Sequence, residues 1–284
     1  MTTEPLIGVL HPWCTDFEWQ RAEHELRRLT PEQRDQFDNG GWLVVDDVVD
    51  NHTLAELTAE LDEIEAEASA FARTQPDDRF AISEADAIMF SPHAVRSSDA
   101  ARRVSRSEVV ADLCHDLIGP DVRLYWDQLV YKSPQKPREF PWHQDNGYVF
   151  IEPQQYLTIW LALTDATVDN GCPWVAPGGH RHGTLAHRYV HPLGLQCFDD
   201  HPDATPAPVA AGGAVVFSSL TPHRTGPNIS ADIRKTYILQ YAPDGVDVLQ
   251  GNPDSGPPTA RIPQCDPDRQ YLVLRDGQRI GTDR

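Results

Sequence analysis

The chain changes from helical to β texture at about Val122, and this change limits the fold more than any other feature. Four later segments are rich in β-branched and aromatic residues: "VRLYWDQLVYK", "YLTIWLALT", "GGAVVFSS" and "RKTYILQYA". Turn-forming runs separate them, among them Asp169-Asn170-Gly171 and Pro177-Gly178-Gly179. The succession predicts a mainly β protein whose core, residues 121–249, is a β-sandwich or jelly roll.

Residues 1–120 are expected to be mostly helical and to buttress the β core. Thr30 is the predicted N-cap of a first helix, because a proline and two good helix formers follow it. Leu54, Leu57 and Leu61 recur at helical spacing in a second helix, whose acidic positions are expected to form a solvated face. No internal repeat interrupts the pattern, so residues 1–284 are interpreted as one domain.

Two stretches have no evident place in a barrel. Residues 73–98 form an irregular stretch, long enough for a functional loop, and the apolar pair Met89 and Phe90 favours a role at an active-site mouth. Residues 250–284 are read as a tail with a two-residue hairpin at Asp276-Gly277, which should dock on the rest of the protein. The alternative, that both stretches only cap the outside of the barrel, stays open.

Composition excludes several classes of partner. The net charge is -19, and none of the 24 Lys and Arg residues joins a long basic run, which argues against nucleic acid and, more weakly, against a polyanion such as coenzyme A. Five widely spaced cysteines without a CxxC pair fit reduced thiols. No apolar run approaches the ~20 residues of a membrane span, and no signal-peptide pattern opens the chain, so a cytoplasmic protein with a small-molecule substrate is expected.

The stretch "PWHQDNGYVF" contains the strongest chemical signal. His143 and Asp145 stand two residues apart, a spacing that points both side chains to one face if the segment is a strand. His223, just after the buried run "GAVVFSS", can supply a third ligand from another strand. Two histidines and one carboxylate form the facial triad of non-haem Fe(II) oxygenases, with coordination positions left open. Taken alone, the pair also fits a surface histidine and a turn-capping aspartate.

The order of the motifs resembles the phytanoyl-CoA dioxygenase family of Fe(II)/2-oxoglutarate enzymes. The likeness runs from "NGGWLVVDDVV" through "LYWDQLVYKSP", "WHQDNGY" and "TIWLALTDATVDNGCPWVAPGGH" to "HRTGPNISADIRKTY". It implies a double-stranded β-helix (jelly roll, cupin-like) in which His143, Asp145 and His223 bind Fe(II). In the family an arginine eleven residues beyond the distal histidine binds the far carboxylate of 2-oxoglutarate, and Arg234 stands there. A guanidinium fork suits that carboxylate.

The resemblance carries over further positions. It implies that three residues contact the co-substrate or line the iron pocket: Lys132, Thr225 and Trp160. Met89, Phe90 and Tyr148 are predicted to border the substrate. The pair His180 and His182 in "GGHRHG" is a rival metal motif, but it follows a Pro-Gly-Gly turn and is interpreted as a loop whose first histidine satisfies nearby backbone.

The resemblance implies that 2-oxoglutarate and O2 are consumed to oxidise a small molecule, such as a secondary-metabolite intermediate. Hydroxylation of an unactivated C–H bond is the expected outcome, with cyclisation, epimerisation or desaturation as alternatives. Halogenation is disfavoured because Asp145 occupies the carboxylate position. Two other classes stay open: a non-catalytic cupin-like protein, which leaves Arg234 without a purpose, and a zinc hydrolase, for which no second carboxylate motif is evident.

Overall fold

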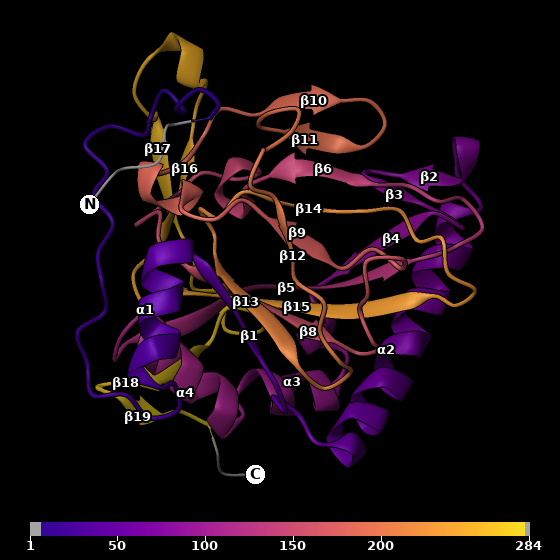
Figure 1. Cartoon of the computed structure of the whole chain (residues 1–284), viewed down its shortest axis with the longest axis horizontal. Helices are drawn as coiled ribbons and strands as arrows, with labels where there is room; N and C mark the ends of the chain where they lie inside the picture. Colours follow the sequence, from indigo (N-terminus) through magenta and orange to yellow (C-terminus); the bar gives the residue numbers. More distant parts are fainter. Residues whose placement is uncertain (1–6, 282–284) are drawn as a thin grey trace.

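The structure, a computed structural model, describes residues 7–281. Two β-sheets lie one above the other, and helices cover the far side of the larger sheet (Figure 1). The helices are α1 (Pro31–Gly40), α2 (Asn51–Ala72), α3 (Asp99–Ser105) and α4 (Glu108–Leu117). This is the predicted mainly β jelly roll with an α-helical buttress.

The larger sheet has ten strands, and the smaller, which lies opposite, has four. The larger runs in the order β1 (Trp42–Val45), β13 (Ala214–Ser218), β8 (Leu157–Ala162), β15 (Arg234–Pro243), β5 (Val122–Lys132), β4 (Ile88–Pro92), β3 (Ser83–Glu84), β2 (Arg79–Phe80), with β18 (Leu272–Arg275) and β19 (Gln278–Arg279) joined at β5. The smaller is β12 (Thr205–Pro206), β9 (Pro173–Val175), β14 (His223–Thr225), β6 (Phe140–His143). Beside these lie the sheet β17 (Ala260–Pro263), β16 (Asp247–Gln250), β7 (Ile151–Glu152) and the hairpin β10 (Arg188–Val190), β11 (Gly194–Gln196).

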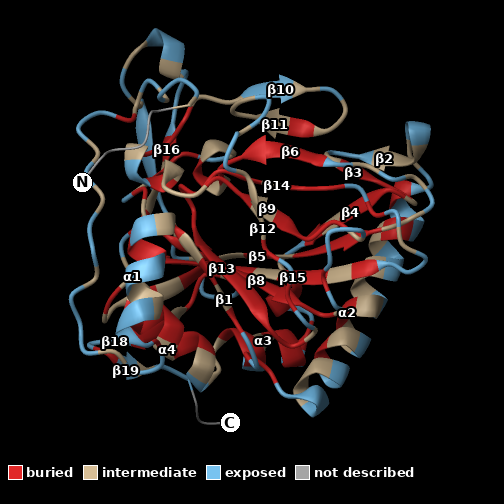
Figure 2. Cartoon of the chain, in the orientation of Figure 1, coloured by how far each residue is buried: buried red, intermediate tan, exposed pale blue. Residues whose placement is uncertain are grey.

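Strand alternation divides the central strands of the larger sheet between two environments. Odd-numbered residues such as Leu129 on β5, Leu239 on β15 and Leu161 on β8 belong to the main core, which they share with Leu57 and Leu61 of α2. Even-numbered residues of the same strands, such as Gln128 on β5, Ile238 on β15 and Trp160 on β8, line the cavity on the opposite side. Figure 2 shows the central strands of the two sheets buried, and α1 and α2 exposed on their outer sides. The inward face of the larger sheet is therefore free to line a cavity.

The helix predictions are confirmed. Thr30 caps α1: its side chain accepts a hydrogen bond from the backbone N–H of Gln33, whose own side chain accepts from the backbone N–H of Thr30. Asp50 caps α2 through the N–H of Thr53. Leu57 and Leu61 are buried in the main core, and Leu54 is partly buried against it. In the view of Figure 2, the outward side of α2 is exposed, as expected for its acidic positions.

The expectation of an irregular stretch at 73–98 is wrong in its middle part. The segment contains β2, β3 and β4, and β4 pairs with β5 from Ile88 opposite Lys132 to Pro92 opposite Gln128. The strand is hard to recognise from sequence because it has only five residues and directly follows polar turns. The segment is therefore an edge of the larger sheet.

The hairpin expected at Asp276-Gly277 is confirmed. Leu274 pairs with Arg279 and Arg275 with Gln278 across the two-residue turn. Both turn residues have positive φ, 49° for Asp276 and 71° for Gly277, as a type I′ turn requires. The hairpin docks on β5, where Leu272 is opposite Arg123.

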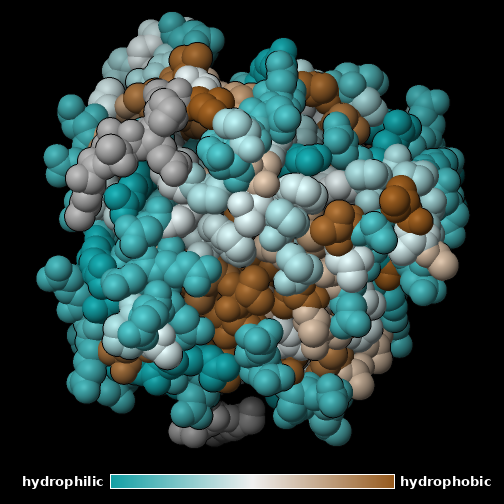
Figure 3. Space-filling view, in the orientation of Figure 1, coloured by the Kyte–Doolittle hydropathy of each residue, from teal (hydrophilic) through white to brown (hydrophobic). Residues whose placement is uncertain are grey.

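The surface is mostly hydrophilic on the face shown in Figure 3, with one hydrophobic area near its centre, over the region of β1 and β13. Within residues 7–281, no helix is long and apolar enough to cross a lipid bilayer.

Candidate active site

Three potential metal ligands meet where β6 and β14 pair. His143 ends β6 and lies directly opposite His223, the first residue of β14. Asp145 lies outside the strand, at the first position of the 3-10 turn η3 (Asp145–Gly147). Its Oδ1 atom lies 3.9 Å from Nε2 of His143 and 3.8 Å from Nε2 of His223. The predicted trio is thus assembled, although a turn and not strand alternation directs Asp145.

Backbone carbonyls fix both imidazole rings. Nδ1 of His143 lies 2.8 Å from the carbonyl oxygen of Pro141, and Nδ1 of His223 lies 3.0 Å from that of Thr221. Because a carbonyl oxygen only accepts, each Nδ1 carries the proton and each Nε2 lone pair faces the site. Burial, with His223 close by, lowers the pKa of His143 well below its usual value. Both features favour metal binding by Nε2.

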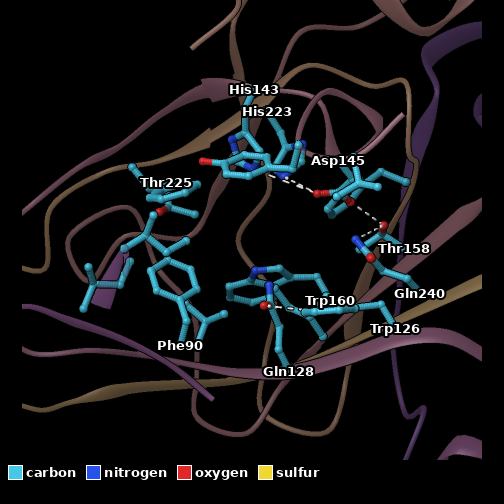
Figure 4. A pocket seen from close by; sticks show the side chains of 18 of the residues that line it. Phe90, Trp126, Gln128, His143, Asp145, Thr158, Trp160, His223, Thr225 and Gln240 are labelled. Carbon is cyan, nitrogen blue, oxygen red and sulfur yellow. Dashed lines mark hydrogen bonds and ion pairs between the residues drawn. The ribbon is translucent and has the colours of Figure 1, made fainter. Parts of the chain in front are cut away.

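Asp145 is held by its second oxygen. Thr158 Oγ1, on β8, lies 2.5 Å from Asp145 Oδ2, and Gln240 Nε2, on β15, lies 3.4 Å from the same hydroxyl. Figure 4 shows this chain of contacts on one side of the cavity, with the two histidines above it. The carboxylate is therefore oriented with Oδ1 towards the histidines. Neither Thr158 nor Gln240 is predicted from the sequence.

Arg234 lies in the cavity wall with an uncompensated charge. Its guanidinium donates hydrogen bonds to the carbonyls of Gly171 (2.8 Å) and Val130 (3.3 Å) and stacks over the ring of Trp160 at 4.9 Å, while Nε has no partner. The residue is 1% exposed, and burial lowers its pKa to about 9. Within the described chain, only Cys172 opposes that shift, and no carboxylate does. A buried cation in this setting is a fitting partner for an anionic ligand.

Lys132 and Thr225, both expected at the co-substrate, have different positions. Thr225 lines the cavity. The ammonium group of Lys132 lies behind it and donates to Thr225 Oγ1 (2.7 Å) and to the carbonyls of Thr225 (3.3 Å) and Gly226 (2.6 Å). Lys132 does not line the cavity. Its observed contacts hold the segment that follows His223.

The cavity between the sheets has a volume of about 310 Å³ and includes the three predicted ligands. Of the residues predicted to border the substrate, Phe90 and Tyr148 line it, and so does Trp160. Met89 does not: it points to the other side of β4 and packs against Ala72 and Ala85. Strand alternation explains this correction, because neighbours on a strand face opposite sides.

The rival pair His180 and His182 lies apart from the trio. His180 is buried, with Nε2 at 3.2 Å from the carbonyl oxygen of Asp38 and its ring against Trp19. Burial lowers its pKa to about 4. His180 is a structural residue, as predicted, but the expectation that it contacts nearby backbone is wrong, because Asp38 is 142 residues away in the sequence. Among the described residues, the one group of three close metal-binding side chains is His143, Asp145 and His223.

Two imidazoles and a carboxylate on one side of a buried cavity match the donor set that non-haem Fe(II) oxygenases use. The family profile described as phytanoyl-CoA dioxygenase (PhyH) matches residues 37–236. The chain belongs to the phytanoyl-CoA dioxygenase family. The members of this family and their structural neighbours are Fe/2-oxoglutarate-dependent oxygenases, which identifies iron and 2-oxoglutarate as the groups that the site should be tested for.

Two curated relatives illustrate the range of the PhyH family. Phytanoyl-CoA dioxygenase domain-containing protein 1 of Danio rerio is 32% identical over 150 residues, 49% of this chain and 51% of that protein. Methylphosphonate hydroxylase of Gimesia maris is 33% identical over 137 residues, 46% of this chain and 50% of that protein. The chain thus matches about half the length of each.

The fold of this chain is similar to that of solved structures. The epimerase SnoN, crystallised with Fe3+, alpha ketoglutarate and a nogalamycin compound, has a TM-score of 0.67 at 20% identity, covering 85% of this chain and 97% of SnoN. At that identity the likeness shows the jelly-roll fold alone.

Proposed function

We propose that this protein is a non-haem Fe(II)/2-oxoglutarate-dependent oxygenase that oxidises a small molecule. The observation that carries the proposal is the pairing of a complete metal-binding trio with a buried, uncompensated Arg234 on the wall of the same cavity. The trio suits Fe(II), and the guanidinium suits the far carboxylate of a dicarboxylic co-substrate.

Each residue has a separate task in this scheme. His143, Asp145 and His223 hold the metal, and Thr158 orients Asp145. Bound Fe(II) supplies the activation of O2 that converts 2-oxoglutarate to succinate and carbon dioxide. Arg234 orients 2-oxoglutarate from the other end, while Trp160 and Phe217 exclude water from the wall between them.

Hydroxylation of an unactivated C–H bond is the proposed outcome. Within the same family one relative is named a hydroxylase, and a structural neighbour is named an epimerase. Cyclisation, epimerisation and desaturation are therefore the alternatives to be separated by product analysis. Asp145 argues against halogenation, which needs the carboxylate position for the halide.

The geometry disfavours the two other classes. A cupin-like binding protein has no need for a buried guanidinium aimed at the cavity. A zinc hydrolase needs a general base beside the metal-bound water, and among the described cavity-lining residues Asp145 is the one carboxylate.

Succinate formation tests the proposal directly. The purified protein should produce succinate from 2-oxoglutarate slowly on Fe(II) addition and faster when a substrate is present. His223→Ala should abolish both rates. Succinate formation that persists without Fe(II), or that is unchanged in His223→Ala, contradicts the proposal.

A further inference from the structure

The wall of the cavity formed by β5 and β15 carries two glutamines, each with one amide group that the metal centre and Arg234 leave free. Gln128 on β5 pairs with Ile238 of β15, and Gln240 on β15 pairs with Trp126 of β5. The two glutamines are therefore diagonal neighbours on adjacent strands, at backbone separations of about 7–8 Å, within reach of long side chains. Both line the cavity.

The orientation of the Gln128 amide follows from its neighbour. The indole Nε1 of Trp126 lies 3.2 Å from Oε1 of Gln128 (Figure 4). An indole N–H only donates, so the amide oxygen must face it and the NH2 group is turned away. Among residues 7–281, no acceptor forms a hydrogen bond with that NH2 group. Gln128 therefore offers the cavity an open donor.

The orientation of the Gln240 amide follows in the same way. The hydroxyl of Thr158 gives its one proton to Asp145, which as a carboxylate only accepts. Thr158 can then only accept from Gln240, so the amide nitrogen faces Thr158 and the oxygen is turned away. Oε1 accepts no hydrogen bond from another described residue. Gln240 therefore offers an open acceptor one side chain away from a metal ligand.

Among the described residues, no charged side chain forms a hydrogen bond with the amide of Gln128 or Gln240. Apart from the two histidine ligands, Arg234 is the one basic side chain among the described cavity-lining residues, and Asp145 the one acidic side chain. The guanidinium of Arg234 is held at the carbonyls of Gly171 and Val130 and over the ring of Trp160, and it forms no hydrogen bond with either glutamine. If Arg234 binds the co-substrate, no other cationic side chain among the described lining residues remains to pair with an anionic group on a molecule held by the glutamines. Most of the remaining lining is aromatic or aliphatic.

We infer that Gln128 and Gln240 are the substrate-recognition pair, and that the substrate is an uncharged, largely apolar small molecule whose hydroxyl or amide group accepts from Gln128 and donates to Gln240. This inference rests on the proposed function, because Arg234 is there assigned to 2-oxoglutarate. It separates this chain from enzymes whose substrates are phosphonates or acyl-coenzyme A thioesters, which require cationic side chains at the substrate end of the cavity.

Lactam probes test the pair. Under nitrogen, with Fe(II) and 2-oxoglutarate bound, titration calorimetry compares the neutral lactam 2-piperidone with cyclohexanecarboxylate and methylphosphonate. We expect 2-piperidone to bind at least tenfold more tightly than either anion. N-methyl-2-piperidone, which lacks the N–H, should lose most of that advantage because Gln240 then has no donor.

Variants assign the recognition to named atoms. Gln128→Leu should weaken 2-piperidone binding at least tenfold, while Gln135→Leu, an exposed glutamine just after β5, should not change it. Gln135 does not line the cavity, so Gln135→Leu should also keep the wild-type rate of substrate-free succinate formation. Binding of an anion as tight as that of 2-piperidone, no 2-piperidone binding to the wild-type protein, or full binding to Gln128→Leu overturns the inference.

The two proposals fail in different ways. If Fe(II) and 2-oxoglutarate support succinate formation but the lactam has no advantage over the anions, the recognition pair is wrong and the oxygenase stands. If no succinate forms under any condition, the proposed function is wrong, and calorimetry still reports on the glutamines.

Discussion

The hydroxyl of Thr158 lies 2.5 Å from Oδ2 of Asp145, the carboxylate oxygen turned away from the two histidines. The contact joins β8 of the larger sheet to the turn that follows β6 of the smaller one. It therefore sets the position of Asp145 from across the cavity. Strand β6 ends at His143, so the Thr158 contact, and not strand pairing, orients the side chain of Asp145.

Thr158→Val should weaken Fe(II) binding without changing the fold. The isosteric change removes the hydroxyl, and loss of such a contact to a metal ligand typically costs about 10–100-fold in metal affinity or activity. Thr158→Ser keeps the hydroxyl and should stay within a few-fold of the wild type. Equilibrium dialysis against Fe(II) measures the effect, and equal affinities of the Val and Ser variants contradict it.

Asp145→Ala should lose nearly all oxygenase activity and keep its fold. The side chain supplies both a negative charge and the third metal ligand, and it is partly exposed to the cavity rather than packed in the core. Succinate formation should fall below about a tenth of the wild-type rate, with an unchanged far-ultraviolet circular dichroism spectrum. Retention of more activity shows that Asp145 is not a ligand.

The trio and Arg234 could be predicted because each stands in a local motif or at a fixed spacing from one. Thr158, Gln128 and Gln240 could not, because their roles depend on which strands lie side by side. A signal was present: Gln128 shares its strand parity with Trp126 and Val130, so it is a polar residue at an inward position. Without the pairing register of β5 and β15, the sequence does not show that Gln128 lies beside Gln240.

Lys132 and Met89 show the limits of position in sequence. Met89 stands between Ile88 and Phe90, and Lys132 stands two residues beyond Val130. These three neighbours line the cavity, yet Met89 and Lys132 make their contacts elsewhere. For Met89 the single-residue alternation of a strand decides the side. The ammonium group of Lys132 lies behind the cavity wall, where it donates hydrogen bonds to three acceptors of Thr225 and Gly226.

Arg234→Lys should raise the apparent constant for 2-oxoglutarate by roughly ten- to a hundred-fold. Lysine keeps a charge but loses the planar fork, and a charge-assisted hydrogen bond contributes about 1.5–3 kcal/mol. Initial rates of succinate formation at varied 2-oxoglutarate measure it. The control is Arg224→Lys, since Arg224 lies on β14 between Trp142 and Trp174 and does not line the cavity. Equal constants in both variants would mean that another residue binds the co-substrate.

Asp127 should make stability depend on pH. Its side chain is fully buried on the helix side of β5, and burial raises its pKa from 3.8 to about 6 despite hydrogen bonds from Val95 and Tyr237. The folded state therefore holds the proton more tightly than the unfolded chain. Burial of the charged carboxylate therefore lowers the free energy of unfolding by its full amount above about pH 6, and this loss of stability disappears as the pH falls towards 3.8.

Between pH 5 and pH 7.5 this residue should reduce the free energy of unfolding by about 1–1.5 kcal/mol. Asp127→Asn should remove that part of the pH dependence while keeping an acceptor for Tyr237. Urea unfolding of both proteins at the two pH values measures the difference. Parallel pH dependence in the two proteins excludes Asp127 as its source.

Phe90→Ala and Met89→Ala form a matched pair that tests whether the 73–98 segment closes the cavity. We propose that β4 and the turns before it shield the active site from water, because Phe90 and Ile82 line the cavity while the neighbouring Met89 packs towards α2. Phe90→Ala opens the wall, so succinate should exceed oxidised product, or rise without substrate, with little change in melting temperature. Met89→Ala leaves a gap beside Ala72 and should lower the free energy of unfolding by about 2–5 kcal/mol while coupling stays tight. Succinate-to-product ratios and thermal denaturation separate the two effects. The same response in both variants, whether uncoupling or destabilisation, would show that the two faces of β4 do not have these separate roles.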